Sequence, residues 1–262
     1  MSFQPVVPLA GYSGWLFLNR TVETQKEAFR ESAPVQRATD AFASRIGAIR
    51  TAEELVSDRE LLFVALGAFG LDDDINNTFF IRKVLEEGTT DPESLANRLA
   101  DPRYADLSKA FGFETGLSQN QLSSFPRKII DRYEARQFER AVGEVNNNFR
   151  LALNFETGLN DVLSRNQTDD GRWFAMMGNA PLRNVFQTSL GFPQSFATLD
   201  LDKQLEQFRG RSSATFGTEE MIDFQNPRLQ EEIIRLFLLR SEAASTASTS
   251  TASIALTLLR SA

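Results

Sequence analysis

Apolar residues recur at spacings of three and four along most of the chain, and sustained alternation with a period of two is hard to find. Leu18, Val22 and Phe29, with a polar break at Gln25, follow one face of a helix near the N-terminus. A second apolar stripe begins after Ser32. Because each stripe must be covered in a core, the pattern predicts an all-α fold.

A pattern of helix starts and stops then recurs over residues 51–71, 90–113, 178–192 and 217–239. Thr51 with Glu54, and Thr90 with Glu93, have the spacing of a capping box, in which a hydroxyl and a carboxylate accept from the first amides of a helix. The recurrence predicts a compact helical domain built from diverged helix-turn-helix repeats.

Helix starts within these copies are predicted at Asp101-Pro102, Asn226-Pro227 and Asn179, because a polar acceptor before proline suits a first turn. Helix ends are predicted where glycine precedes an apolar residue, since that pair suits a left-handed stop and a latch on the last turn. The glycines are Gly70, Gly112 and Gly191.

One long helix of about 40 residues, roughly 60 Å, is predicted from Phe125 onward. Gly143 and Gly158 are the positions within it where a kink or a break is expected. Residues 1–240 are interpreted as one all-helical domain, or as two sub-domains of about 1–120 and 121–240.

Residues 241–262 are predicted to form a flexible tail, because the Ser/Thr/Ala-rich run "SEAASTASTSTAS" has little apolar surface to bury. The tail ends in a short apolar segment. We expect this segment to contact a partner or the body, and its candidate partner-binding residues are Ile254, Leu256, Leu258 and Leu259.

Composition narrows the chemistry of this 262-residue chain. It has 22 Phe but only 3 Tyr and 2 Trp, which favours core packing over a wet recognition surface. A net charge of −7 and scattered arginines argue against nucleic acid as a partner. The absence of His and Cys excludes imidazole bases, thiolate nucleophiles and the usual zinc sites, so no catalytic residue, cofactor or metal site is predicted. An enzyme built on carboxylates alone is the alternative that remains.

The ends of the chain carry no evident targeting or membrane signal. The start, "MSFQPVVPLAGYSGWLFLNR", lacks the basic and apolar regions of a cleaved signal peptide. No apolar run approaches the roughly 18 residues of a membrane-spanning helix.

Three consecutive acids, Asp72 to Asp74, are the most site-like polar cluster. A calcium loop would need alternating ligands, a turn glycine and a late glutamate, none of which is correctly placed. We therefore interpret the cluster as the approach to a helix N-terminus, where acids and Asn are favoured.

Trp173, Met176 and Met177 form an apolar group with two interpretations. An apolar stripe of Met and Trp could form a hydrophobic groove for a partner helix, so the three are candidate partner-binding residues. Burial in a core is the commoner fate of such residues and is the alternative.

Four stretches, "GWLFLNRTVETQKEAF", "DRELLFVALGAFGLDDDINNTFFIRKVLEEG", "ESLANRLADPRYADLSKAFGF" and "FGTEEMIDFQNPRLQEEIIRLFL", carry a family resemblance. Together they resemble the bacterial domain-of-unknown-function family 1217 (DUF1217), over the chain up to about Leu239. The resemblance implies an all-helical fold with related copies in one chain. It also implies a flagellar setting, because genes of this family often sit within bacterial flagellar gene clusters.

Two functions follow as expectations. One is a non-enzymatic, flagellum-associated structural or assembly protein that acts through protein contacts, either cytoplasmic or exported without a cleaved signal. The other is a cytoplasmic adaptor, chaperone-like or regulatory protein with a groove near Trp173. The sequence leaves the oligomeric state and the identity of the partner open.

Overall fold

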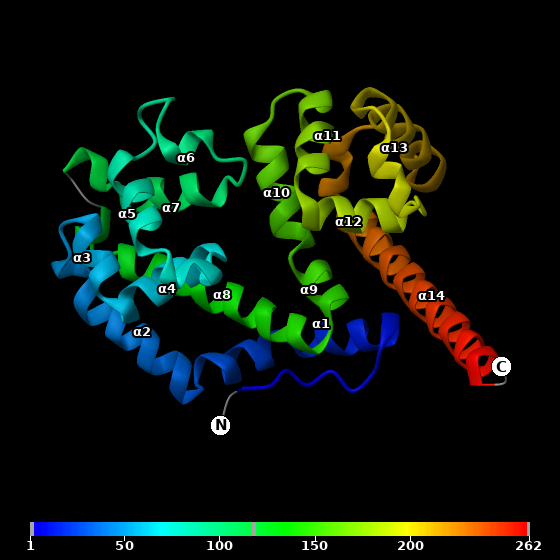
Figure 1. Cartoon of the computed structure of the whole chain (residues 1–262), viewed down its shortest axis with the longest axis horizontal. Helices are drawn as coiled ribbons and strands as arrows, with labels where there is room; N and C mark the ends of the chain where they lie inside the picture. The colour runs from blue at the N-terminus through cyan, green and yellow to red at the C-terminus, as the bar shows by residue number, and fades with distance from the viewer. Residues whose placement is uncertain (1–2, 117–118, 261–262) are drawn as a thin grey trace. The chain divides into compact units, whose positions relative to one another are not determined.

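The computed structural model describes residues 3–116 and 119–260, with side chains described as far as Thr246. These residues form fourteen α-helices and six short 3₁₀ helices, and the described part of the chain contains no β-strand (Figure 1). The predicted all-α fold is confirmed. The helices belong to two compact units, one of residues 1–5 and 21–141 and one of residues 6–20 and 142–262.

The sub-domain division expected near residue 120 differs from these units. The chain passes from the first unit to the second at Ala141–Val142, inside helix α8 (Phe125–Val145), so no linker marks the boundary. Residues 6–20 join the second unit, where the Trp15 ring packs on Phe149 with 6.5 Å between centroids. Helix α1 (Gly11–Arg30) therefore contributes residues to both units.

The first unit is built around helix α4 (Arg59–Phe69), whose residues are buried on almost every side. A helix that is apolar all round belongs inside a core. Helices α2 (Ala33–Arg45), α3 (Ala52–Ser57) and α7 (Arg103–Phe111) pack against it. Helix α8 also contacts it, where the Tyr133 ring lies 6.0 Å from that of Phe63. Helices α5 (Thr78–Glu87) and α6 (Leu95–Arg98) pack on each other and on α7.

Short 3₁₀ turns complete the first unit. They are η1 (Ile46–Ala48), η2 (Asp72–Asn76), η3 (Phe113–Thr115) and η4 (Gln119–Gln121). Asn120 is buried and donates to the carbonyls of Ile46 and Ile49, both at 2.7 Å, so that η4 holds the end of η1 in place.

The second unit contains the start of α1 and the helices that follow α8. They are α9 (Asn147–Leu153), α10 (Phe155–Arg165), α11 (Asp169–Gly178), α12 (Ala180–Ser189), α13 (Leu201–Phe216) and α14 (Pro227–Arg260), with η5 (Gln194–Thr198) and η6 (Met221–Gln225). Its core centres on Trp173, whose indole lies 6.0 Å from the rings of Phe186 and Phe208 and 6.4 Å from that of Phe224. Helix α14 packs mainly against α12, through Ile233, Phe237 and Leu238 on its buried side.

Most of the predicted helix ends are confirmed. Asp101, Asn179 and Asn226 each accept a hydrogen bond from a backbone amide of the first turn that follows, at 3.0–3.1 Å. Gly70 and Gly112 both end helices in the left-handed conformation, with φ of +68° and +64°. Gly191 has a φ of +73°, and the amide of Phe192 donates to Gln187 O, which completes the predicted latch.

The two predicted capping boxes have different outcomes. Thr51 Oγ1 accepts from the amide of Glu54 at 3.1 Å, although the Glu54 carboxylate reaches the amide of Arg50 rather than that of Thr51. The Thr90–Glu93 box is wrong. The Thr90 hydroxyl donates instead to Glu114 at 2.9 Å, because Glu114 also accepts from the amide of Thr89 and so closes the turn after α5.

The single long helix expected from Phe125 is also wrong, because three helices, α8, α9 and α10, cover this stretch. The main break is at Asn146, which is extended (φ −154°, ψ 109°) and caps α9 by accepting from the amide of Asn148. Neither expected glycine breaks the helix. Gly143 lies inside α8, where a Cβ atom would come within 2.6 Å of Arg150 Cδ, so its role is to admit the Arg150 side chain.

Candidate interaction surface

Two acids of the Asp72–Asp74 cluster, Asp72 and Asp74, are engaged in contacts within the first unit. Asp72 Oδ1 accepts from Gln137 Nε2 at 2.6 Å and lies 3.1 Å from Arg140 Nη1. Asp74 accepts from the Tyr104 hydroxyl and from Asn77 Nδ2, both at 2.7 Å. The cluster thus joins η2 to α7 and α8. As expected, the cluster leads directly into the N-terminus of a helix, α5, with Asn77 at the N-cap position, although the Asn77 side chain makes no capping hydrogen bond there.

Two tyrosines near this cluster, Tyr104 and Tyr133, have raised pKa values. Burial, together with the hydrogen bond to Asp74, raises the pKa of Tyr104 to about 12. Burial, with the charge of Asp72, raises the pKa of Tyr133 to about 12 as well. Both phenols therefore remain protonated at neutral pH and act as donors or packing groups rather than as bases.

A shallow surface depression lies between the end of α2 and the start of α4. At its wall, Arg45 pairs with Asp58 at 2.8 Å and with Glu60 at 2.5 Å. Within the described residues, no group of three or more acids is arranged to hold a metal ion.

The three apolar candidates of the second unit, Trp173, Met176 and Met177, are buried, with at most 5% of any of them exposed. The Trp173 indole N–H donates to the carbonyl of Glu219 at 2.9 Å. Their burial corrects the prediction that they bind a partner and supports the core interpretation. It also removes the groove on which the adaptor function was based.

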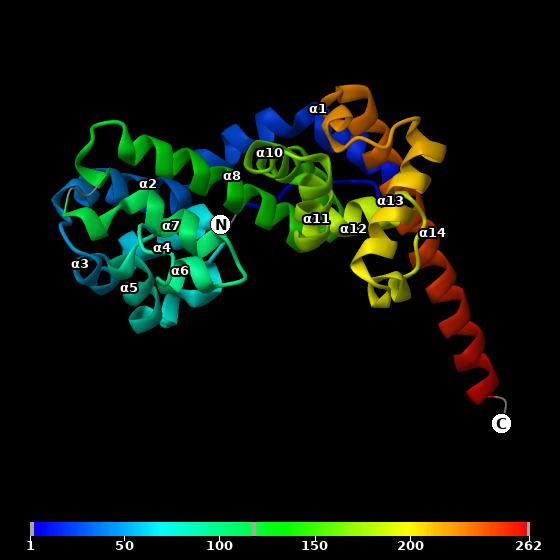
Figure 2. The same cartoon turned by 90° about the horizontal axis from the view of Figure 1, so that it is seen from above.

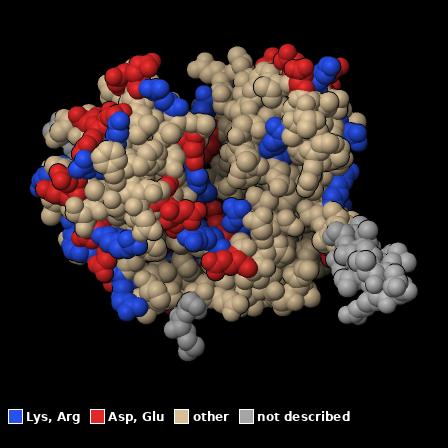
Figure 3. Space-filling model, viewed as in Figure 1, with Lys and Arg blue, Asp and Glu red and all other residues tan. Residues whose placement is uncertain are grey.

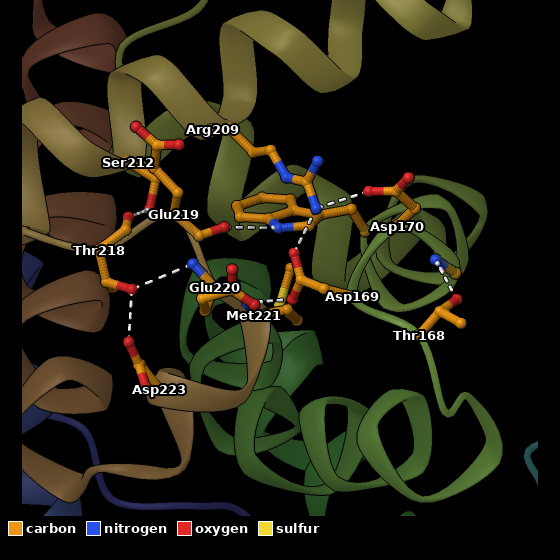
Figure 4. Close-up of polar contacts among 12 residues, drawn as sticks. Thr168, Asp169, Asp170, Arg209, Ser212, Thr218, Glu219, Glu220, Met221 and Asp223 are labelled. Carbon is orange, nitrogen blue, oxygen red and sulfur yellow. Dashed lines mark hydrogen bonds and ion pairs between the residues drawn. The ribbon is translucent and has the colours of Figure 1, made fainter.

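The polar residues above this core tie the segment between α13 and α14 to α11, as Figure 4 shows. Asp169 Oδ1 accepts from the amide of Met221 at 2.7 Å, and its other oxygen pairs with Arg209. Arg209 also pairs with Asp170 at 2.6 Å. The Ser212 hydroxyl donates to Thr218 O at 2.7 Å.

This network is not among the features predicted from the sequence. A signal was present, because Thr168 Oγ1 accepts from the amide of Gly171, an N-cap that places both acids in the first turn of α11. The sequence could not show that Arg209, forty residues away, would meet them.

Surface charge on the face seen in Figure 3 is mixed, with Lys and Arg interspersed among Asp and Glu and no continuous basic patch on that face. The expectation that nucleic acid is not a partner remains a prediction. Within the described residues, no helix has the length and hydropathy needed to cross a membrane.

The described side chains of the C-terminal segment leave the core early in α14. Leu238 is buried, Leu239 is 44% exposed, and residues 242–246 are exposed. Figures 1 and 2 agree that the C-terminal half of α14 extends away from α12 and α13. The helix thus runs through the predicted tail, whose flexibility remains a prediction. The side chains of Ile254, Leu256, Leu258 and Leu259 lie outside the described residues.

One contact joins α14 to α1 near the point where α14 leaves the core. The Glu242 carboxylate lies directly beside Gly11, the first residue of α1, and a Cβ atom there would overlap it. Nearby, the Tyr12 hydroxyl is hydrogen bonded to Glu231, and burial and this acid raise the pKa of Tyr12. Helix α14 is therefore anchored as far as Glu242 and carries the candidate interaction surface beyond it.

Comparison with known proteins supports the fold and gives a family. The chain is similar to the crystal structure of a protein from Agrobacterium tumefaciens, with 25% identity, a TM-score of 0.66, and coverage of 89% of this chain and 97% of the other. No curated protein matches the chain. The model of the family described as "Protein of unknown function (DUF1217)" matches residues 68–229, which is more than half of the sequence. The chain therefore belongs to the DUF1217 family.

Proposed function

We propose that this protein is a non-enzymatic structural or assembly protein associated with the bacterial flagellum, and that it acts through contacts with other proteins. The observation that carries the proposal is its membership of the DUF1217 family. The sequence resemblance to that family implies genes located within flagellar gene clusters. In this setting the protein acts in the cytoplasm or is exported to the flagellum without a cleaved signal.

The acidic side chains make structural hydrogen bonds, which supports a role in protein contacts rather than in catalysis. The acids most suggestive of chemistry, Asp72, Asp74 and Asp169, each bind donors within their own unit. A general acid or base needs a group that can reach a substrate and exchange a proton with it. Acids committed to structural donors are poor candidates for that task.

The exposed part of α14 is the proposed partner-binding segment. Residues beyond Glu242 are uncharged as far as Arg260, and the segment ends in the apolar residues Ile254, Leu256, Leu258 and Leu259. An exposed helix with an apolar end is a common element of helix-in-groove and helix–helix recognition. It supplies an attachment point that deletion can remove without cutting into the core.

The experiment is co-purification from flagellated cells of a bacterium that carries this gene. We expect the full-length chain to enrich motor, rod, hook or export components. A variant with Ile254, Leu256, Leu258 and Leu259 changed to Ser should lose this enrichment. A matched control with Ser245 and Thr246 changed to Ala, on the same helix, should keep it. Failure of the full-length chain to enrich any flagellar component would contradict the proposal.

A further inference from the structure

Phe79 is the most exposed large apolar side chain among the described residues, with 71% of its surface open to solvent. It lies in the first turn of α5, whose opposite side is buried in the first unit. Steps of three and four lead from Phe79 to Arg82, Lys83 and Glu86, so these four residues share the outer side of the helix. A single exposed ring is common on protein surfaces, and its surroundings decide what it means.

Arg82 connects the Phe79 ring to α3. Its guanidinium lies over the ring, 5.6 Å from the centroid, and its nitrogens lie 3.6 Å from Glu86 and 3.7 Å from Glu53, which belongs to α3. These contacts hold the guanidinium against the ring, so that both are presented together. We call the outer residues of the two neighbouring helices the α3–α5 face, which consists of Glu53, Glu54, Phe79, Arg82, Lys83 and Glu86.

Negative charge is concentrated around the α3–α5 face. Residues 45–60 and 72–87 carry nine acids and five bases, a net charge of −4, whereas the other 230 residues together carry −3. The helices and turns formed by these two stretches pack on one another within the first unit. Arg140 of α8 balances one of the acids, Asp72. An excess of three negative charges then remains on this part of the surface.

The shallow depression between α2 and α4 adjoins the same face. Glu53 lines the depression and pairs with Arg82. Arg59, also in its lining, donates to the Asn76 side chain at 3.2 Å, three residues before Phe79. Of the nine residues that line the depression, four are acids and two are arginines. An exposed ring, a hollow and an excess of carboxylates therefore lie next to one another.

Charge complementarity selects the kind of partner that fits this surface. Carboxylates that lose water on binding need a positive counterpart, and an acidic or uncharged partner would not supply one. Lysine and arginine side chains can lie along an aromatic ring with their apolar stems and reach neighbouring acids with their charged ends. An apolar side chain beside them would cover the rest of Phe79.

We propose that the α3–α5 face and the adjoining depression bind a basic, amphipathic segment of a partner protein. The basic side chains of this segment meet the carboxylates, and its apolar side chains cover Phe79. The inference goes beyond the proposed function, which uses the C-terminal part of α14 in the second unit. The two can therefore fail separately.

Fluorescence anisotropy tests the apolar part of the surface on the full chain. The probe is a labelled helical peptide with leucine on one side and lysine on the others. We expect Phe79→Ser to weaken binding of the peptide about tenfold, as the loss of a central aromatic contact does, and Phe79→Leu to retain most of the affinity. Leu201→Ser is the matched control, because Leu201 is also 55% exposed but lies in the second unit. It should bind the peptide like the wild-type chain.

A second pair of variants tests the charge. Glu53→Gln combined with Glu86→Gln should weaken binding by roughly threefold or more and make it less sensitive to salt. Asp202→Asn combined with Glu206→Gln removes the same charge from exposed positions of α13 and should have little effect. Equal losses in the two double variants would overturn the proposal, because the attraction would then depend on net charge alone.

Three other results would also overturn it. They are no binding of the peptide, equal affinity of the Phe79→Ser and Leu201→Ser chains, and equal affinity for a peptide in which serine replaces leucine. A chain that enriches flagellar components but binds the peptide equally well with and without Phe79 would contradict this surface alone. A chain that binds the peptide through Phe79 but enriches no flagellar component would contradict the proposed function alone.

Discussion

Asp169 and Asp170 are adjacent in the sequence but have very different surroundings. The Asp169 side chain is 15% exposed and joins Arg209 to the amide of Met221, whereas the Asp170 side chain is 61% exposed and meets Arg209 alone. A charged contact loses value as solvent screens it. Most of the stabilisation in this network is therefore expected from Asp169.

We predict that Asp169→Asn lowers the free energy of unfolding of the second unit by about 1–3 kcal/mol, because it leaves Arg209 without its better-shielded counter-charge. Asp170→Asn, the matched control, should cost less than about 1 kcal/mol. Both tryptophans, Trp15 and Trp173, belong to the second unit, so denaturant unfolding followed by tryptophan fluorescence reports on it. Equal midpoints for the two variants would contradict this account.

Glu134 in the first unit provides a pH-dependent test. Its Oε2 lies 2.9 Å from Arg30 Nε, in an ion pair without hydrogen-bond geometry. Burial raises the pKa of Glu134, and the charges of Arg30 and Arg127 offset this only in part. A raised folded-state pKa means that the folded chain binds the proton more tightly than the unfolded chain. This contribution to stability is present at low pH and is lost as pH rises through the folded pKa.

We therefore predict that Glu134→Gln gains stability relative to the wild-type chain as pH rises from about 4 to about 7, because the glutamine cannot ionise. Thermal unfolding followed by circular dichroism across this range measures the difference between the two proteins. Effects of other titrating groups cancel in that difference. A difference that is constant, or that shrinks as pH rises, would show that burial does not raise the pKa of Glu134.

At the scale of elements, two glycines of the second unit show how conformation decides the effect of one methyl group. Gly210 lies inside α13 and Gly217 ends it with φ +78°, and a Cβ atom on either would have no neighbour within 4 Å. A methyl group thus has room at both positions, which differ only in their backbone conformation.

We predict that Gly210→Ala raises the free energy of unfolding by up to about 1 kcal/mol, since alanine is the better helix former. Gly217→Ala should lower it by about 1–2 kcal/mol, because the left-handed conformation strains any residue with a Cβ atom. Tryptophan fluorescence during urea unfolding measures both. Shifts of the same sign would refute the helix-end interpretation of Gly217.

The helix ends that the sequence predicted correctly are those set by neighbouring residues. Asn179 and Asn226 cap the turn that follows them, and Gly70 and Gly112 need only their own φ. The errors involve distant partners or competing local signals. The Thr90 hydroxyl donates to Glu114, a residue distant in the sequence, instead of capping a helix. The break after Phe125 falls at Asn146 rather than at Gly143, because the Asn146 side chain accepts from a backbone amide and so begins a new helix.

At the scale of the whole molecule, much of the candidate surface was visible from composition. The uncharged run after Glu242 and its apolar end stand out in the sequence. What the sequence could not give is the point at which α14 leaves the core. That point depends on α12, on Gly11 beside Glu242 and on the hydrogen bond between Tyr12 and Glu231.

We predict that deletion of residues 245–262 leaves the melting temperature of the remaining chain nearly unchanged, because α14 is anchored by residues up to Glu242. Differential scanning calorimetry of both chains provides the comparison. A large fall in melting temperature would mean that the deleted segment packs on its own body.

The central claim is that this protein works at the flagellum through its C-terminal helix, and cell fractionation tests it most directly. The full-length chain and the chain ending at Ala244 would each be traced through cytoplasm, basal bodies and culture fluid of flagellated cells. We predict that the full-length chain is found with basal bodies or with exported flagellar material and that the truncated chain is lost from both. Recovery of the two chains in the same fractions, or of the full-length chain only in cytoplasm free of flagellar components, would contradict the claim.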